Sequence, residues 1–269
     1  MVCMNQQLTL PVVLCFSGLD PTGGAGIQAD IETIVSMGAH PAPVVTALTV
    51  QDTSTVKRFE VVNSLLLVEQ ARTVLEDMQV AAIKIGMLAN RSIIEAIHSI
   101  LVDYPDIPVV LDPVLKGGGG GQLLNEDAQD ALLELLLPQT TLLTPNSIEA
   151  RALAKDADSL AACAESLLDK GCKYVLLTGG HEKTEGIVNT LYSNHRELEQ
   201  TDWQRLPHQY HGSGCTLAAA IAAMLAQGLD PVMAVNEAQA FTWESLKHAH
   251  RIGMGQLIPN RLFWAREED

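Results

Sequence analysis

The stretch that decides the fold is Val12–Gly26, which reads VVLCFSGLDPTGGAG. Its first part is a short apolar run rich in Val and Leu, a pattern typical of a buried strand. Its second part contains too many glycines to form a helix. Beyond it, Ile27, Ile31 and Ile34 recur at helical spacing, and Gly38 stands where a helix commonly ends. The stretch therefore predicts a strand, a loop and a helix in that order.

Outward from this unit, the same alternation repeats along the whole chain. Nearly all-apolar strands separated by helices indicate a mostly parallel sheet covered by helices on both faces. Because we find no linker and no solenoid repeat, we expect one three-layer α/β domain over residues 1–269. The expected strands are Val12–Phe16, Val44–Val50, Ala81–Met87, Pro108–Val114, Thr141–Thr144, Lys173–Thr178, Ile187–Tyr192 and Arg196–Thr201. The expected later helices are Ser64–Met78, Ser92–Val102, Glu126–Leu136, Asn146–Leu153, Leu160–Lys170, Cys215–Gln227 and Val232–His250.

Composition and charge narrow the class of function. The 269 residues are 47% hydrophobic and 18% charged, so the chain can bury a large core. Its formal net charge is −15, which repels the phosphate backbone of a nucleic acid. We therefore expect no nucleic-acid partner, although a small phosphorylated ligand could still be held by local N–H groups.

The cysteines and the apolar stretches indicate the compartment. The five cysteines form no C-x-x-C motif and have no metal-type spacing, which argues against both a disulfide framework and a zinc site. We find no signal-type segment at the N-terminus. The Ala-rich stretch Thr216–Leu229 is shorter than the roughly 20 residues that a membrane span needs. We expect a cytoplasmic protein without a membrane partner.

Glycines and polar residues collect after the predicted strands. In sheets of this kind the ligand binds beyond the carboxyl ends of the strands, so these loops are expected to form one site. Taken singly, each loop could be no more than a turn. The loops are Gly18–Gly26, Gln51–Asp52, Gly86–Met87, Asp112–Gly121, Asn146–Glu149, Gly179–His181 and His211–Thr216. Among them, the five consecutive glycines of Gly117–Gly121 predict a mobile flap.

The strongest local signal is Gly212-Ser213-Gly214-Cys215, which precedes a helix of small residues. Glycines let several N–H groups face one point, and the helix dipole adds to them, so an anion or phosphate would be stabilised there. Neither a P-loop motif nor a dinucleotide fingerprint fits this stretch. At a helix start, Cys215 should have a lowered pKa and could act as a base or nucleophile. The alternative is a small buried apolar residue.

A second candidate site follows Thr144-Pro145. Asn146 and Glu149 lie one helical turn apart and could hold a hydrated Mg²⁺ through oxygen ligands. The same spacing is that of an ordinary capping box, which we favour from the residues alone. Asp112, at another strand end, has the same ambiguity.

Six motifs, colinear from about Val12 to about Leu246, carry a resemblance to a known family. On them the chain resembles the hydroxymethylpyrimidine/phosphomethylpyrimidine kinases of thiamine biosynthesis, in the ribokinase-like superfamily. The resemblance implies a three-layer ribokinase-like fold, Mg²⁺-dependent transfer from ATP to the hydroxymethylpyrimidine and then to its monophosphate, and a homodimer. The motifs are Gly18-x-Asp20-Pro21-x-Gly23-Gly24-Ala25-Gly26-Ile27-Gln28-Ala29-Asp30, Thr46-Ala47-Leu48-x-x-Gln51, Lys84-Ile85-Gly86-Met87-Leu88, Asp112-Pro113-Val114, Thr144-Pro145-Asn146-x-x-Glu149 and His211-Gly212-Ser213-Gly214-Cys215-Thr216-Leu217.

The resemblance also implies roles for individual residues. Cys215 would be the base, at a position where the wider superfamily has Asp. Gly212, Ser213 and Gly214 would form the anion hole for the transferring phosphoryl group. The implied pyrimidine pocket consists of Gly18, Asp30, Val50, Gln51 and Met87. The implied nucleotide contacts are Asp112, Asn146 and Thr178, and the implied Mg²⁺ site is Asn146 with Glu149.

The chain departs from many family members at two positions. Gly118 and Thr178 stand where many members have Lys, and those lysines would neutralise phosphate charge. The alternatives are therefore a pyridoxal kinase-like enzyme of the same superfamily and a catalytically silent ligand sensor on the same fold. A nucleotide-dependent oxidoreductase is disfavoured because the dinucleotide fingerprint is missing.

Overall fold

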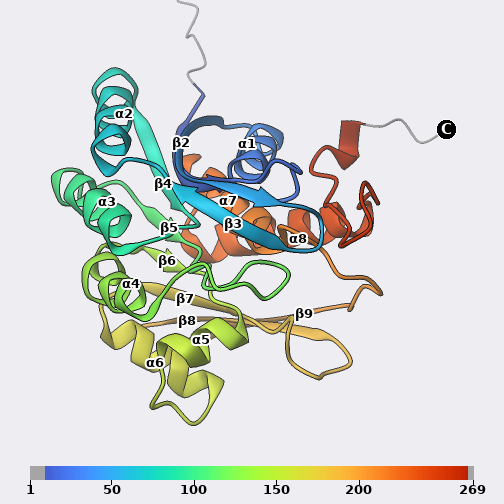
Figure 1. The fold of residues 1–269 in the computed structure, drawn as a ribbon. Coiled ribbons are helices and arrows are strands. Elements are labelled where there is room, and N and C mark those ends of the chain that lie inside the picture. Colours follow the sequence, from blue (N-terminus) through green and yellow to red (C-terminus); the bar gives the residue numbers. More distant parts are fainter. Residues whose placement is uncertain (1–9, 266–269) are drawn as a thin grey trace, which may run out of the picture.

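The computed structural model describes residues 10–265, and the predicted alternation of strands and helices is confirmed (Figure 1). Cys3 lies outside the described residues. The strands are β1 (Val12–Leu19), β2 (His40–Gln51), β3 (Val56–Val61), β4 (Val80–Ile85), β5 (Val109–Leu111), β6 (Leu142–Leu143), β7 (Tyr174–Thr178), β8 (Ile187–Ser193) and β9 (Arg196–Trp203). The helices are α1 (Gly26–Ser36), α2 (Ser64–Asp77), α3 (Arg91–Asp103), α4 (Glu126–Ala131), α5 (Ser147–Leu153), α6 (Leu160–Asp169), α7 (Ser213–Ala226) and α8 (Pro231–Lys247). A π-helical turn (Leu132–Leu136) and a 3-10 turn (Leu137–Gln139) continue α4, and a second 3-10 turn (Phe263–Ala265) follows α8.

One nine-stranded sheet connects these elements, in the order β3-β2-β1-β4-β5-β6-β7-β8-β9. The strands from β2 across to β7 are parallel, whereas β3, β8 and β9 run antiparallel to their neighbours. After β1 the chain forms β2 on one side of it, and later it forms β4 on the other side. This change of direction opens a crevice beyond the carboxyl ends of β1 and β4, which is where ligands bind in such sheets.

Helices cover both faces of the sheet, so the molecule has three layers (Figure 1). Helices α2 to α6 pack over one face, where a large apolar core includes Phe16 and Ile97. Helices α1, α7 and α8 pack over the other face around a second core that includes Ile34 and Ile221. The run of small residues in α7 allows close approach, because Ala218 to Ala223 are buried against the sheet and α1. The predicted α/β class with a mostly parallel sheet is confirmed.

The largest differences from the predicted elements lie at the β2–β3 edge. Strand β2 begins at His40, before the predicted Val44, although Pro41 and Pro43 lie in its first half. Proline is tolerated there because β3 pairs with β2 only from Ala47 onward, so the missing N–H groups face an open edge. Strand β3 was not predicted, because its sequence VKRFEV mixes charged and apolar residues on an exposed edge.

The described residues contain no helix that is both long enough and apolar enough to cross a membrane. The longest helix, α8, has 17 residues and carries both acidic and basic side chains.

Candidate active site

A cavity of about 550 Å³ lies beyond the carboxyl ends of the strands, at the predicted edge of the sheet. This volume falls in the range of small-molecule sites. Its wall is built mainly from the loops that follow β1, β2, β4, β5, β6 and β7, together with the start of α7. The structure brings to this wall the predicted residues Gly18, Gln51, Met87, Asp112, Asn146, Glu149, Thr178, Gly212, Ser213, Gly214 and Cys215.

Asp20 organises the glycine loop between β1 and α1. Its carboxylate accepts hydrogen bonds from the backbone N–H groups of Thr22 (2.8 Å) and Ala25 (2.9 Å). It also accepts one from Nε2 of His211 (2.8 Å), which must be the donor because a carboxylate can only accept. Although burial raises the pKa of Asp20, hydrogen bonds from His211, Gln51 and Thr22 hold that pKa well below its usual range. One buried carboxylate therefore ties the glycine loop to the segment before α7 and to the amide of Gln51.

Two helices begin at the cavity and point their N-termini into it. Helix α1 starts at Gly26, and α7 starts at Ser213 after Gly212, whose φ is +84°. A side chain at Gly212 would overlap the carbonyl oxygen of Gly24, so only glycine fits there. The first N–H groups of a helix have no partner within the helix, so both starts offer donors to an anion. The predicted anion hole therefore lies at a helix start beside the cavity, and its role stays a prediction.

Cys215 lies in the first turn of α7, but its predicted low pKa is wrong for this structure. Burial raises the pKa of its thiol to about 12, and the carboxylates of Asp112 and Asp30 add to the effect. The ammonium of Lys84 and a hydrogen bond from Gly26 lower the pKa only in part. The helix dipole alone does not outweigh the loss of solvation. We therefore expect the Cys215 thiol to be protonated at neutral pH, close enough to the Asp112 carboxylate for each group to change the pKa of the other.

Asn146 and Glu149 form the capping box that we favoured from the residues alone. The Asn146 side chain accepts from the N–H groups of Ile148 and Glu149 at 3.0 Å each, and Glu149 accepts from the N–H of Asn146 at 3.0 Å. Glu149 nevertheless lines the cavity. Burial, and then repulsion from Asp112, raises its pKa to about 8. Burial likewise raises the pKa of Asp112, to about 6.

The far end of the cavity is lined by aromatic and amide side chains that the sequence did not single out. Trp203 and Trp243 stack with their ring centroids 6.1 Å apart, and both line the cavity. The side-chain oxygen of Gln239 accepts from Trp203 (3.1 Å) and from Asn189 (2.8 Å). Asn189 in turn accepts from the N–H of Gly179 (3.1 Å). This end can hold a flat ring with polar edges.

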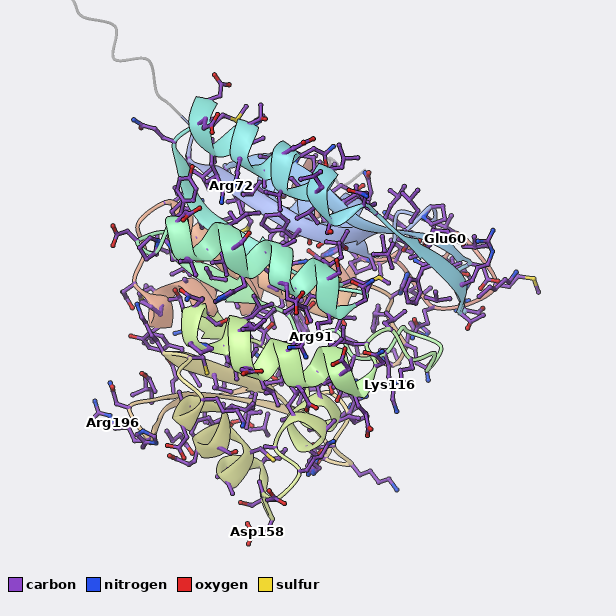
Figure 2. The ribbon with its side chains drawn as sticks, turned by 60° about the vertical axis from the view of Figure 1, so that its left-hand side comes forward. Glu60, Arg72, Arg91, Lys116, Asp158 and Arg196 are labelled. Carbon is purple, nitrogen blue, oxygen red and sulfur yellow. The ribbon has the colours of Figure 1, made fainter. Side chains whose placement is uncertain are left out.

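The glycine run Gly117–Gly121 forms a hydrogen-bonded loop over the cavity. The N–H of Gly117 donates to Gly121, and that of Gly120 donates to Gly117, at 2.8 Å each. Lys116 precedes the run and projects from this loop (Figure 2). Lys116 is also among the residues that line the cavity. The mobility of this flap stays a prediction.

Two predicted pocket residues, Asp30 and Val50, are not at the cavity wall. Asp30 is fully buried beneath it and forms an ion pair with Lys84, whose Nζ lies 2.8 Å from Oδ1. Burial opposes the charge of Lys84, yet Asp30 and the neighbouring acidic groups raise its pKa overall. Val50 is 42% exposed and is not among the residues that line the cavity. Helical and strand periodicity does not show which of these side chains reaches a ligand.

Sequence reasoning also missed residues that shape the site. Asp20 and His211 lie in two of the family motifs, but no role was predicted for either residue. An Asp followed by Pro at a strand end nevertheless indicates a structured turn. Lys84 carried a signal too, because a lone Lys in an apolar strand must be paired when it is buried. Arg261 carried none, since it follows the last predicted helix.

Comparisons with known proteins agree with this geometry. The family model described as phosphomethylpyrimidine kinase matches residues 20–260. The chain belongs to the phosphomethylpyrimidine kinase family. A kinase of this family from Rhizobium meliloti, named hydroxymethylpyrimidine/phosphomethylpyrimidine kinase, is 38% identical over 250 residues, which cover 91% of this chain and 94% of that protein. Its counterpart from Mycobacterium tuberculosis is 40% identical over 263 residues and 95% of each chain.

Solved structures of two kinds of vitamin kinase are similar to this family member. An ADP complex of Bacillus subtilis pyridoxal kinase has a TM-score of 0.87 at 27% identity, covering 96% of this chain and 100% of that one. Phosphomethylpyrimidine kinase from Clostridium difficile has a TM-score of 0.74 at 33% identity, covering 86% and 97%. The predicted ribokinase-like architecture is confirmed by these likenesses.

The raised pKa values of Asp112 and Glu149 predict how stability depends on pH. The folded protein binds protons at these carboxyls more tightly than the unfolded chain does, so their contribution is present at low pH and is lost as pH rises through about 6 and about 8. We expect the free energy of unfolding to fall between about pH 4 and pH 8, and Glu149→Gln to flatten that fall. Gln keeps the capping box, because its amide oxygen can still accept from Asn146.

Urea denaturation of the wild type and the variant across this pH range measures the effect. Glu69→Gln, which changes an exposed carboxylate on α2, is the control and should keep the wild-type slope. Parallel pH curves for the wild type and Glu149→Gln would show that Glu149 ionises normally in the folded protein.

Proposed function

We propose that this chain transfers the γ-phosphoryl group of ATP to 4-amino-5-hydroxymethyl-2-methylpyrimidine, and then to its monophosphate, in thiamine biosynthesis. The observation that carries the proposal is the start of α7, where free N–H groups and Cys215 face the same cavity as the glycine loop. A hydroxymethyl group placed there would meet a phosphoryl group at the helix N-terminus. The family and the relatives named hydroxymethylpyrimidine/phosphomethylpyrimidine kinase support this substrate.

The pyrimidine would lie against Gly18, Gln51 and Met87. A side chain at Gly18 would press on the sulfur of Met87, so glycine leaves room for a flat ring beside the thioether. The Gln51 amide is held by Asp20 and lies 3.5 Å from Nε2 of His211. An amide fixed in this way can read the donor and acceptor edge of an aminopyrimidine.

ATP would extend from the anion hole toward the aromatic end of the cavity. The N–H groups of Ser213 and Gly214 would face the transferring phosphoryl group, and Thr178 would lie along the nucleotide. Asn146 could contribute its amide N–H₂ to phosphate, since its oxygen is used in the capping box. Lys116 is the flap cation that could reach phosphate oxygens.

The carboxylates fit a hydrated Mg²⁺. The described residues contain no cluster of three His, Cys, Asp or Glu side chains that could hold an ion alone. Mg²⁺ needs no such cluster, because it keeps several waters and is often bound through one or two carboxylates and the substrate phosphates. Glu149, whose pKa is raised in part by Asp112, would hold the ion, which would neutralise charge on the phosphates when bound.

Cys215 would take the substrate proton as a relay. In a loose transition state the hydroxyl oxygen loses its proton late, when its new bond to phosphorus has made it strongly acidic. The proton would then pass to the sulfur of Cys215 as the thiol proton moves to the neighbouring Asp112 carboxylate. This route needs no pre-formed thiolate, in agreement with the raised pKa of Cys215.

The exposed face at the β2–β3 edge fits a second copy of the chain. Leu48 (49% exposed) and Val50 (42% exposed) lie on that face, and Arg58 and Glu60 of β3 pair with each other there. Glu60 lies on the part of β3 that extends beyond the helices (Figure 2). Opposite charges beside apolar residues can pair across a two-fold axis. Light scattering on the purified chain tests this homodimer, and a monomer mass at micromolar concentration would exclude it.

The activity is tested by ADP release with hydroxymethylpyrimidine and with pyridoxal side by side. Pyridoxal is included because the pyridoxal kinases are similar over nearly the whole chain. Turnover of the pyrimidine supports the proposal, whereas turnover of pyridoxal alone would replace it by pyridoxal kinase activity. Binding of the pyrimidine without ADP release would indicate a silent sensor.

The four described cysteines are free, as in a reducing cytoplasm, which is the compartment that we propose.

Gln51→Leu should raise KM for the pyrimidine far more than KM for ATP. The substitution leaves polar groups of the ring unpaired, which costs about 1–3 kcal/mol, or roughly 5- to 150-fold in affinity. Steady-state kinetics with each substrate varied in turn measures the ratio. Equal changes in the two KM values would show that Gln51 does not contact the ring.

Cys215→Ala should lower kcat by about 10²-fold, the usual scale for losing a positioned proton acceptor. Cys215→Ser should retain more activity, because a hydroxyl can both accept and pass on a proton. KM for both substrates should change little in either variant. Equal kcat values for the Ala and Ser variants would remove the relay and leave Cys215 as a packing residue.

A further inference from the structure

Arg261 is a fully buried cation that the proposed mechanism does not use. Arg261 is 1% exposed. It lies after α8 in the chain. The residues before it pair with the segment that precedes α7, and the final 3-10 turn follows it. Nη1 lies 3.0 Å from a carboxylate oxygen of Glu32, which balances its charge. Nη2 donates to the carbonyl of Gly24 at 2.6 Å, and Nε donates to the hydroxyl of Thr216 at 2.9 Å. The guanidinium therefore joins α1, the glycine loop and the first turn of α7.

Thr216 connects the Arg261 guanidinium to the anion hole. Its hydroxyl, which accepts from Arg261, donates to the carbonyl oxygen of Gly212 at 2.8 Å. The backbone N–H of Thr216 donates to the same oxygen at 2.9 Å. Because a peptide group is planar and trans, the N–H of Ser213 must point opposite to this carbonyl. Holding the Gly212 carbonyl toward α7 therefore aims the Ser213 N–H away from the helix, into the cavity.

The same guanidinium sets how closely the glycine loop approaches α7. A side chain at Gly212 would overlap the carbonyl oxygen of Gly24 and would come within 2.9 Å of Nη2 of Arg261. Gly24, Gly212 and Arg261 thus pack with no spare room. The substrate pocket adjoins the glycine loop and the anion hole adjoins Gly212, so this packing fixes the distance between them.

We propose that Arg261 is a positioning residue, which orients the Ser213 N–H of the anion hole through Thr216 and holds the glycine loop against it. Arg261 would touch neither substrate. Small misplacements of groups that act only in the transition state lower kcat more than they weaken binding. This proposal rests on the proposed phosphoryl transfer, because its main readout is the turnover of that reaction.

The test compares Thr216→Val with Thr216→Ser, because only serine keeps the hydroxyl that links Arg261 to Gly212. We expect Thr216→Val to lower kcat by about 10- to 100-fold, somewhat less than deleting an oxyanion-hole donor, with both KM values within about threefold of wild type. Thr216→Ser should recover most of that loss. Arg261→Lys should lower kcat as well, and adding Thr216→Val to it should cost little more, since the two residues act in series.

Trp264→Phe is the matched control in the same C-terminal segment. It removes the hydrogen bond from Trp264 to the hydroxyl of Ser36 and leaves the contacts of Arg261 in place, so kcat should stay at the wild-type value. Melting temperatures are measured for every variant, because a merely structural role would lower them without changing kcat per folded enzyme. If Arg261→Lys does not fold, the two Thr216 variants still decide, and equal kcat values for them would overturn the proposal.

A second readout separates this inference from the proposed function. If the wild type phosphorylates neither the hydroxymethylpyrimidine nor pyridoxal, the proposed function fails, and affinity for inorganic phosphate then reports on the anion hole directly. Thr216→Val should bind phosphate at least about fivefold more weakly than Thr216→Ser, because it loses orientation of one charge-assisted donor. Equal phosphate affinities for the two variants would overturn the positioning role independently of turnover.

Discussion

The contact between the Gly24 carbonyl and Gly212 is the constraint on which the site depends. It brings the loop after the first strand against the start of α7, so that two helix N-termini open into one cavity. Such close approach of two backbones is available only to glycine at position 212, where φ is also positive. Asp20 secures the contact from the cavity side through His211, and Arg261 secures it from the buried side. The glycines of the site thus allow backbone segments to pack closely rather than making the site flexible.

The charges around this contact are arranged for a ligand rather than for stability. Asp112 and Glu149 repel each other in a buried position, and the thiol of Cys215 is kept protonated nearby. Lys84 lowers the pKa of Asp112 and of Cys215, but much of its charge is already balanced by Asp30. Uncompensated carboxylates of this kind cluster at functional sites, because a bound cation or proton relieves them.

The layered fold could be predicted from the sequence because most of its strands and helices carry their own pattern of apolar residues. Most of the cavity wall could be predicted as well, since parallel strands end at one edge and the glycines mark those ends. The environment of each side chain could not be predicted from the sequence. Asp30 lies in a recognisable motif, yet it turns inward to Lys84, and this depends on a contact between residues far apart in sequence. The pKa of Cys215 depends in the same way on burial by several segments, so the local helix dipole misled the prediction. Arg261 follows no periodic pattern, and only the assembled structure shows its partners.

The bond between Arg261 and Gly24 joins residues 237 positions apart, which has a consequence for the order of folding. During synthesis the first strands and the glycine loop leave the ribosome before the segment that contains Arg261. The partner that locks the loop, Arg261, is made 237 residues after Gly24. A contact of such long range forms late, because closing the chain costs entropy before the contact is gained. A nascent chain that already has its parallel sheet would therefore still lack a finished active site until Arg261 has emerged.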